Sequence, residues 1–252
     1  MLIDELLGYL FDGQPHILAP SMTTWLATSR RFTDFVTTFR DKIRKKLRTT
    51  QDQETLYDLR LELETAYLLL QEQPLSLVYE PPCGQGRCPD FAATYTTSLT
   101  FMVEVTRLRA VQRGTSPSAW EQAHDSPPPE SALLVAGERL ADAICSKLGQ
   151  MPPQRSNVLI LGVDAPRPSQ NDLQAAMLLA QQRAERNDSA FWRRYRFRDR
   201  SDFFRHYQRL SEVLMQESKL PEDKPAVTWI NPQAKYPLPG KVRTALYRSH
   251  DV

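Results

Sequence analysis

What the sequence lacks excludes several classes of protein. Across its 252 residues, no apolar run reaches the roughly 18 residues that a membrane-spanning helix needs. The three cysteines are an odd number, which argues against a disulfide framework and is typical of a reducing compartment. The N-terminus carries Asp4 and Glu5 where a secretory signal peptide carries bases. We therefore expect a cytoplasmic protein with no membrane partner.

Motifs of three common enzyme groups are also missing. The sequence contains no Gly-rich phosphate loop, no His-Glu-x-x-His helix and no Gly-x-Ser-x-Gly elbow. Kinase, metalloprotease and hydrolase chemistries of those types are therefore not indicated. The formal net charge of +2 is close to neutral, so the overall charge identifies no partner.

The order of apolar patterns predicts the fold class. Helical spacing predicts helices over residues 2–12, from Ser21 or Thr23 to about residue 48, and over 51–73. Short branched and aromatic runs predict strands at 75–79, 89–95 and 98–108. A helix at 131–150, a continuously apolar strand at 158–163, helices near 172–186 and 199–217, and a strand at 226–230 follow. This order predicts an α/β fold with one mixed sheet.

Two carboxylates on neighbouring predicted strands carry the chemistry. Asp90 begins one strand, and Glu104 lies in the next with Thr106 two residues further on the same face. If the two strands pair as a hairpin, Asp90 lies beside Glu104. Carboxylates held close repel each other, and a divalent cation is the usual remedy. Mg²⁺ (or Mn²⁺) suits such a site, because it needs few protein oxygens and lowers the pKa of bound water.

The arrangement resembles the PD-(D/E)XK (restriction-endonuclease-like) nuclease superfamily. That pattern is a helix Glu, then Pro-Asp, then Glu-x-Lys on the next strand, then a helix. Here it corresponds to Glu62 (or Glu64), Pro89-Asp90 and Glu104-Val105-Thr106, within roughly residues 55–163. The resemblance implies a restriction-endonuclease-like mixed sheet flanked by helices over 51–252, with residues 1–50 as an N-terminal helical extension. It further implies a metal-dependent endonuclease acting on DNA, possible homodimers, and a role in defence or mobile-element biology.

The sequence departs from the family at the motif lysine, which is replaced by Thr106. Threonine supplies no positive charge to an attacking water or a transition state. Some related nucleases take this lysine from the following helix, and Lys147 is the candidate here. Arg107 is a poorer substitute, because strand alternation sends its side chain to the opposite face. We predict that Lys147 points toward Asp90 and Glu104.

Other features have alternative interpretations. Cys83 and Cys88 flank a glycine-containing loop and could bind zinc, although the sequence lacks a second Cys pair, so two cysteines flanking a turn is the simpler interpretation. The segment 191–200 interleaves arginines with aromatics, as a nucleic-acid surface does, but its rings could equally pack inward while its arginines pair with carboxylates. The basic run at 40–48 could bind DNA or be a solvated helix face.

Two hypotheses follow. In the first, the protein is a metal-dependent endonuclease acting on DNA, with Asp90 and Glu104 as metal ligands and Glu62 and Lys147 as further catalytic residues. In the second, it has kept the fold, lost the catalysis and serves as a nucleic-acid-binding or protein-interaction module. Thr106 favours the second hypothesis, and metal affinity discriminates between the two.

Overall fold

The computed structural model describes residues 3–50, 52–82, 88–108, 130–163, 168–186, 188–217 and 226–250. Four helices come first, and a sheet interleaved with further helices follows. In chain order the elements are α1 (Ile3–Phe11), α2 (Ala19–Thr28), α3 (Arg30–Thr49), α4 (Gln53–Gln71), β1 (Leu75–Tyr79), β2 (Phe91–Tyr95), β3 (Leu99–Leu108), α5 (Glu130–Leu148), β4 (Asn157–Val163), α6 (Gln170–Glu185), α7 (Ser189–Tyr195), α8 (Arg200–Tyr207), β5 (Leu210–Glu217), β6 (Val227–Ile230) and α9 (Gly240–Arg248).

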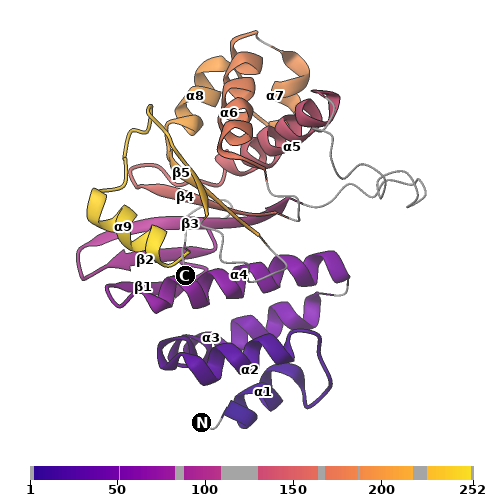
Figure 1. The fold of residues 1–252 in the computed structure, drawn as a ribbon, viewed down its shortest axis with the longest axis vertical. Helices are drawn as coiled ribbons and strands as arrows, with labels where there is room; N and C mark the ends of the chain where they lie inside the picture. The colour runs from indigo at the N-terminus through magenta and orange to yellow at the C-terminus, as the bar shows by residue number, and fades with distance from the viewer. Residues whose placement is uncertain are drawn as a thin grey trace.

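The described strands form one mixed sheet in the order β1-β2-β3-β4-β5-β6. Strands β1, β2 and β3 pair antiparallel, β3, β4 and β5 pair parallel, and β6 runs antiparallel to β5. Helix α4, with α1–α3 beneath it, covers one face, and α5–α8 cover the other (Figure 1). The predicted α/β class with one mixed sheet is confirmed.

Each face of the sheet has its own hydrophobic core. One core joins α1–α4 and α9 to the sheet through residues such as Phe32, Leu69 and Val103. The other joins α5–α8 to the opposite face through Leu148, Phe203 and others. Strand β4 is buried along its whole length because it lies between the two cores, as its continuous apolar run predicted. Since the described residues 3–50 share the first core with the sheet, the separation of residues 1–50 as an extension stays a prediction.

Local capping explains one difference from the sequence prediction. A single helix was expected from Ser21 or Thr23 to about residue 48, but the structure has α2 and α3. Ser29 separates them: its backbone is extended, with φ −134° and ψ 106°, and its side chain accepts a hydrogen bond from the Phe32 amide. The hydroxyl thereby satisfies one of the free N–H groups at the start of α3. Asp52 caps α4 in the same way.

Two further differences lie in the C-terminal third. The helix predicted near 199–217 was wrong in its second half, where β5 runs as a central strand. Both faces of β5 are buried, so its apolar residues do not alternate, and such a run resembles a buried helix. Helices α7 and α9 were not predicted. No helix in the described part of the chain is long and apolar enough to span a bilayer.

Candidate active site

The β2–β3 hairpin brings Asp90 beside Glu104. Phe91 pairs with Val103 in the antiparallel register, so the residue before Phe91 faces the residue after Val103. Asp90 Oδ2 accepts a hydrogen bond of 2.7 Å from the Val105 amide, which fixes the carboxylate at the edge of the hairpin. The expected proximity of Asp90 and Glu104 is therefore confirmed.

Lys147 reaches these two carboxylates from α5, which covers the face of the sheet opposite to α4. Its Nζ lies 2.6 Å from Glu104 Oε1, although the two residues are 43 positions apart in the chain. Since α5 ends directly above β3, the predicted approach of Lys147 to Glu104 is confirmed, while its catalytic role stays a prediction.

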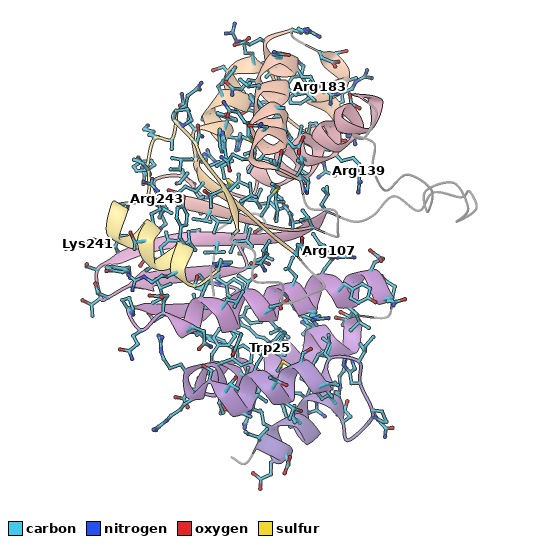
Figure 2. All side chains as sticks on the ribbon, in the orientation of Figure 1. Trp25, Arg107, Arg139, Arg183, Lys241 and Arg243 are labelled. Atoms are coloured by element: carbon cyan, nitrogen blue, oxygen red, sulfur yellow. The ribbon has the colours of Figure 1, made fainter. Side chains whose placement is uncertain are left out.

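Arg107 points to the other face of β3, as strand alternation requires. Arg107 lies between the sheet and α4 (Figure 2), where its guanidinium pairs with Glu54 and Asp58 and is almost fully buried. Arg107 therefore joins β3 to α4, and its charge lies on the opposite face of the strand from Glu104.

Glu62 reaches the carboxylates from α4 and has a partner that sequence reasoning missed. Lys46 Nζ of α3 lies 2.6 Å from Glu62 Oε1 and 2.9 Å from Glu80 Oε1. The same ammonium lies 4.8 Å from the centre of the Tyr79 ring. The available signal was the position of Lys46 at the edge of the buried face that Ile43 and Leu47 define.

The pKa values of the predicted carboxylates are shifted by burial and by one another's charges. Burial, and next the charge of Glu104, raises the pKa of Asp90 to about 7. Burial, and next the charge of Asp90, raises the pKa of Glu62 to about 7. The pKa of Glu104 is also raised, mainly by burial, although Lys147 opposes the shift. Glu62, Asp90, Glu104 and Lys147 therefore lie together.

The alternative helix residue, Glu64, belongs to a different environment. Its carboxyl is also buried, and burial raises its pKa, but Arg60 is the charge that acts on it rather than Asp90 or Glu104. Of the two candidates on α4, Glu62 is thus the one that faces the carboxylate pair.

A pocket of about 530 Å³ opens over the site. Asp90, Glu104, Lys147 and Gln150 line it, together with Glu80, Pro81, Pro82 and Cys88. Cys88 is disulfide-bonded, while Cys145 is free and buried, so the odd number of cysteines, which argued against a disulfide framework, did not exclude a single disulfide. Cys83, the other residue of the zinc alternative, lies outside the described residues.

The donor set fits a small divalent cation with two carboxylate ligands. Glu104 Oε2 is buried and has no hydrogen-bond partner among the residues that the structure describes, so these leave one oxygen of the pair unsatisfied inside the pocket. An unpaired buried carboxylate oxygen is costly, and a cation would satisfy it. No cluster of three or more His, Cys, Asp or Glu side chains with metal-binding geometry occurs in the described ranges. Mg²⁺ commonly takes only one or two carboxylates and keeps several waters.

In the arginine–aromatic segment at 191–200, aromatic rings pack into the core while the arginine side chains are exposed. Phe191, Trp192 and Phe197 are buried in the second core, as the inward-packing alternative expected. Arg198 pairs with Asp202, and Arg194 pairs with Asp142. The Arg196 side chain is exposed.

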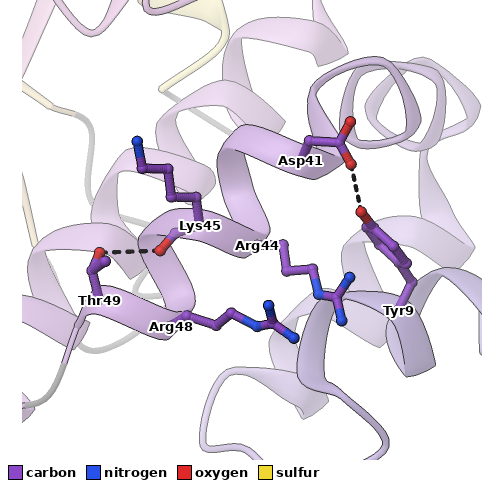
Figure 3. Close-up of a pocket in the computed structure, with 6 residues that line it drawn as sticks. All are labelled: Tyr9, Asp41, Arg44, Lys45, Arg48 and Thr49. Carbon is purple, nitrogen blue, oxygen red and sulfur yellow. Dashed lines mark hydrogen bonds between the residues drawn. The ribbon is translucent and has the colours of Figure 1, made fainter.

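Several bases of the run at 40–48 pair with carboxylates of the same chain. Arg44 and Arg48 both pair with Asp12, and the Tyr9 hydroxyl donates to Asp41. Figure 3 shows the two arginines directed toward the side of Tyr9 in a pocket of about 430 Å³. These pairs favour the interpretation of a helix face whose charges are satisfied internally.

Comparison with known proteins returns nothing: no family model, curated protein or solved structure matches the chain.

Proposed function

We propose that this protein is a metal-dependent nuclease that hydrolyses phosphodiester bonds in DNA. The observation that carries the proposal is the 2.6 Å contact between Lys147 Nζ and Glu104 Oε1, beside the hydrogen-bonded Asp90. It brings the buried carboxylate of Glu104, the half-buried carboxylate of Asp90 and an ammonium into one pocket, as the family resemblance requires once Thr106 has replaced the motif lysine. The element order α4, β1, β2, β3, α5, β4 is consistent with the same resemblance.

Each residue has a distinct role in the proposed reaction. Asp90 and Glu104 would hold the Mg²⁺ or Mn²⁺. Once bound, the cation supplies positive charge to the phosphate and lowers the pKa of the attacking water. Lys147 would orient that water and stabilise the negative charge that develops on phosphorus oxygens. Glu62, whose pKa of about 7 lies near physiological pH, would accept a proton through a water. The water oxygen bonds to phosphorus, the bond from phosphorus to the leaving sugar oxygen breaks, and that oxygen takes a proton from solvent.

The direct test is cleavage of labelled single- and double-stranded DNA, and of RNA, with Mg²⁺, Mn²⁺ or EDTA. We expect metal-dependent cutting of DNA that Asp90→Ala abolishes. Asp4→Ala is the matched control, because it removes an exposed aspartate on α1, at the far end of the molecule from the sheet (Figure 1). Activity that survives in purified Asp90→Ala would show that the site is elsewhere. Gel filtration of the same preparation tests the homodimer that the resemblance implies.

The replacement of the motif lysine by Thr106 favours one other function, that of a binding module without catalysis. Metal affinity separates the two. Ligand binding stabilises the folded state by RT ln(1 + [L]/Kd), so a cation at ten times its Kd contributes about 1.4 kcal/mol and raises Tm by roughly 2–4 °C. The nuclease hypothesis expects this shift with Mg²⁺ or Mn²⁺ and its loss in Asp90→Asn. The binding-module hypothesis expects no shift in either protein.

A further inference from the structure

A second pocket adjoins the carboxylate pocket around the end of α5. It holds about 620 Å³. One wall is a face of α5 and its following turn, which includes Ser146 and Gln150, and the other is the end of α7 with His206 of α8. Gln150 lines both pockets, so the two are neighbours on one surface. A chain molecule bound in one pocket can therefore continue into the other.

The charge of this second pocket is positive on balance. Its one carboxylate, Asp142, is already engaged: Arg194 lies 2.5 Å from it, Arg183 lies 3.8 Å from it, and the Tyr195 hydroxyl donates to it. Burial lowers the pKa of His206, which keeps that ring neutral at physiological pH. The Arg196 side chain lines the pocket and has no hydrogen-bond or ion-pair partner among the residues that the structure describes. It is therefore available to an anion.

The backbone at Arg196 is strained in a way that the fold itself does not require. Arg196 follows the last residue of α7 with φ 60° and ψ 32°, the left-handed conformation in which glycine is usual. A non-glycine residue is less stable than glycine in this conformation. Its amide caps α7 by donating to the Trp192 carbonyl, which glycine would do equally well. The cap therefore does not require the Arg196 side chain, which lines the pocket.

We propose that this second pocket binds the phosphate backbone of a DNA strand next to the phosphate held in the carboxylate pocket, with Arg196 as its main contact. The inference rests on the proposed function and adds a subsite to it. Arginine makes charge-assisted hydrogen bonds with phosphate, and phosphate contacts position a strand without reading its sequence. Ser146 and Gln150 contribute polar groups beside Arg196, and the half-buried Tyr195 ring offers an edge for base contact.

The test is fluorescence anisotropy with labelled single- and double-stranded DNA in EDTA, where a metal-dependent nuclease does not cut. Arg196→Gly is the informative variant, because glycine accepts the left-handed backbone and only the guanidinium is lost. We expect binding about tenfold weaker, and a slope of log K against log salt smaller in magnitude by about 0.7–0.9. Tm should stay equal or rise. Lys241→Ala, which removes one exposed charge on the distant helix α9, should leave the affinity and the slope unchanged (Figure 2).

Several results would overturn the inference. The first is wild-type protein that does not bind DNA. The second is Arg196→Gly that binds DNA as tightly as wild type and with the same salt slope. The third is Lys241→Ala that loses as much DNA affinity as Arg196→Gly. Binding of inorganic pyrophosphate without binding of DNA would also overturn it. Arg196→Asn, which tolerates the same backbone, serves if the glycine variant does not fold. Metal-dependent cutting that is lost in Asp90→Ala reports separately on the proposed function, so either idea can fail alone.

Discussion

Lys147 and Glu104 form an ion pair of 2.6 Å between a helix and a strand that lie on different layers of the fold. Thr106 lies two residues after Glu104 on the same face of β3, so a lysine at 106 would send its ammonium into the same space. The chain thus supplies positive charge at this point from α5 instead of from β3. If the carboxylates act on phosphate, the position of the ammonium matters more than whether the lysine comes from α5 or from β3.

If a lysine at 106 can replace Lys147, adding it should restore cleavage activity that the loss of Lys147 removes. Lys147→Met should lower metal-dependent DNA cleavage about 10²–10⁴-fold, the usual effect of losing a group that moves a proton or stabilises developing charge. The double variant Thr106→Lys with Lys147→Met should recover part of that loss, because the ammonium returns to the same side of β3. Initial cleavage rates at saturating Mg²⁺ measure both effects.

A control separates this result from a general loss of charge. Lys235→Met removes an exposed lysine in the segment after β6 and should leave the rate unchanged. If Lys147→Met cuts at the wild-type rate, the lysine is a structural partner of Glu104 and has no part in the reaction. A double variant that folds normally, as judged by Tm, and still has no activity would show that position 106 cannot replace position 147.

The raised pKa of Asp90 predicts an unusual pH dependence of stability. Its folded-state pKa is about 7, whereas an unperturbed aspartate has a pKa of 3.8. Between these values the native protein holds a proton that the unfolded chain releases, so the free energy of unfolding falls as pH rises. The slope is about 1.4 kcal/mol per pH unit for each extra proton held. We therefore expect the metal-free protein to be less stable at pH 8 than at pH 5, as measured by urea unfolding.

Asp90→Asn tests the source of this dependence. The amide oxygen can still accept from the Val105 amide, but it carries no charge to repel Glu104. The variant should be more stable than wild type at pH 8, with a flatter profile between pH 5 and pH 8. An unchanged profile would mean that another group holds the proton. Asp12, whose pKa is lowered to about 2 by Arg48 and Arg44, loses stabilisation only below that window and does not contribute.

Much of the site could be predicted because it depends on local spacing. The hairpin brings Asp90 to Glu104 through one turn, and alternation along β3 fixes which side chains share a face. The contribution of Lys46 could not be predicted in the same way. Periodicity places Lys46 at the edge of the buried face of α3, but its contact with Glu62 depends on how α3 packs across α4.

The elements of the fold were likewise predictable where they depend on local sequence patterns and were missed where they depend on packing. Strands with an alternating or isolated apolar pattern, such as residues 75–79, were predicted with the bounds that the structure has. The helix expected near 199–217 was wrong beyond α8, because periodicity cannot separate a strand buried on both faces from a buried helix segment. Ser29 was missed because a single capping hydroxyl inside a continuous helical pattern gives little signal until its backbone is seen.

Gly162 is predicted to be a close-packing position between β4 and α4. A Cβ at this position would lie 2.9 Å from Leu61 Cδ1, closer than real contacts allow. Gly162→Ala should therefore lower the free energy of unfolding by about 1–3 kcal/mol, the usual cost of overpacking. Gly8→Ala is the control with the opposite sign: nothing lies within 4 Å, and alanine in the interior of α1 should add about 0.5–1 kcal/mol. Equal stability of the two variants in urea would contradict the packing argument.

The Lys46–Glu62 ion pair predicts that α3 contributes to the site itself. Lys46→Met leaves the buried Glu62 carboxylate without its nearest cation, which should cost about 1–3 kcal/mol at pH 8. At pH 5 the loss should be much smaller, because Glu62, with its pKa of about 7, is then protonated and neutral in the folded state. Lys45→Met, at the neighbouring exposed position, should change stability little at either pH. Urea unfolding of both variants at the two pH values decides the matter. Equal losses for Lys46→Met at pH 5 and pH 8 would mean that its effect comes from packing of the side-chain stem, and α3 would then have no electrostatic part in the site.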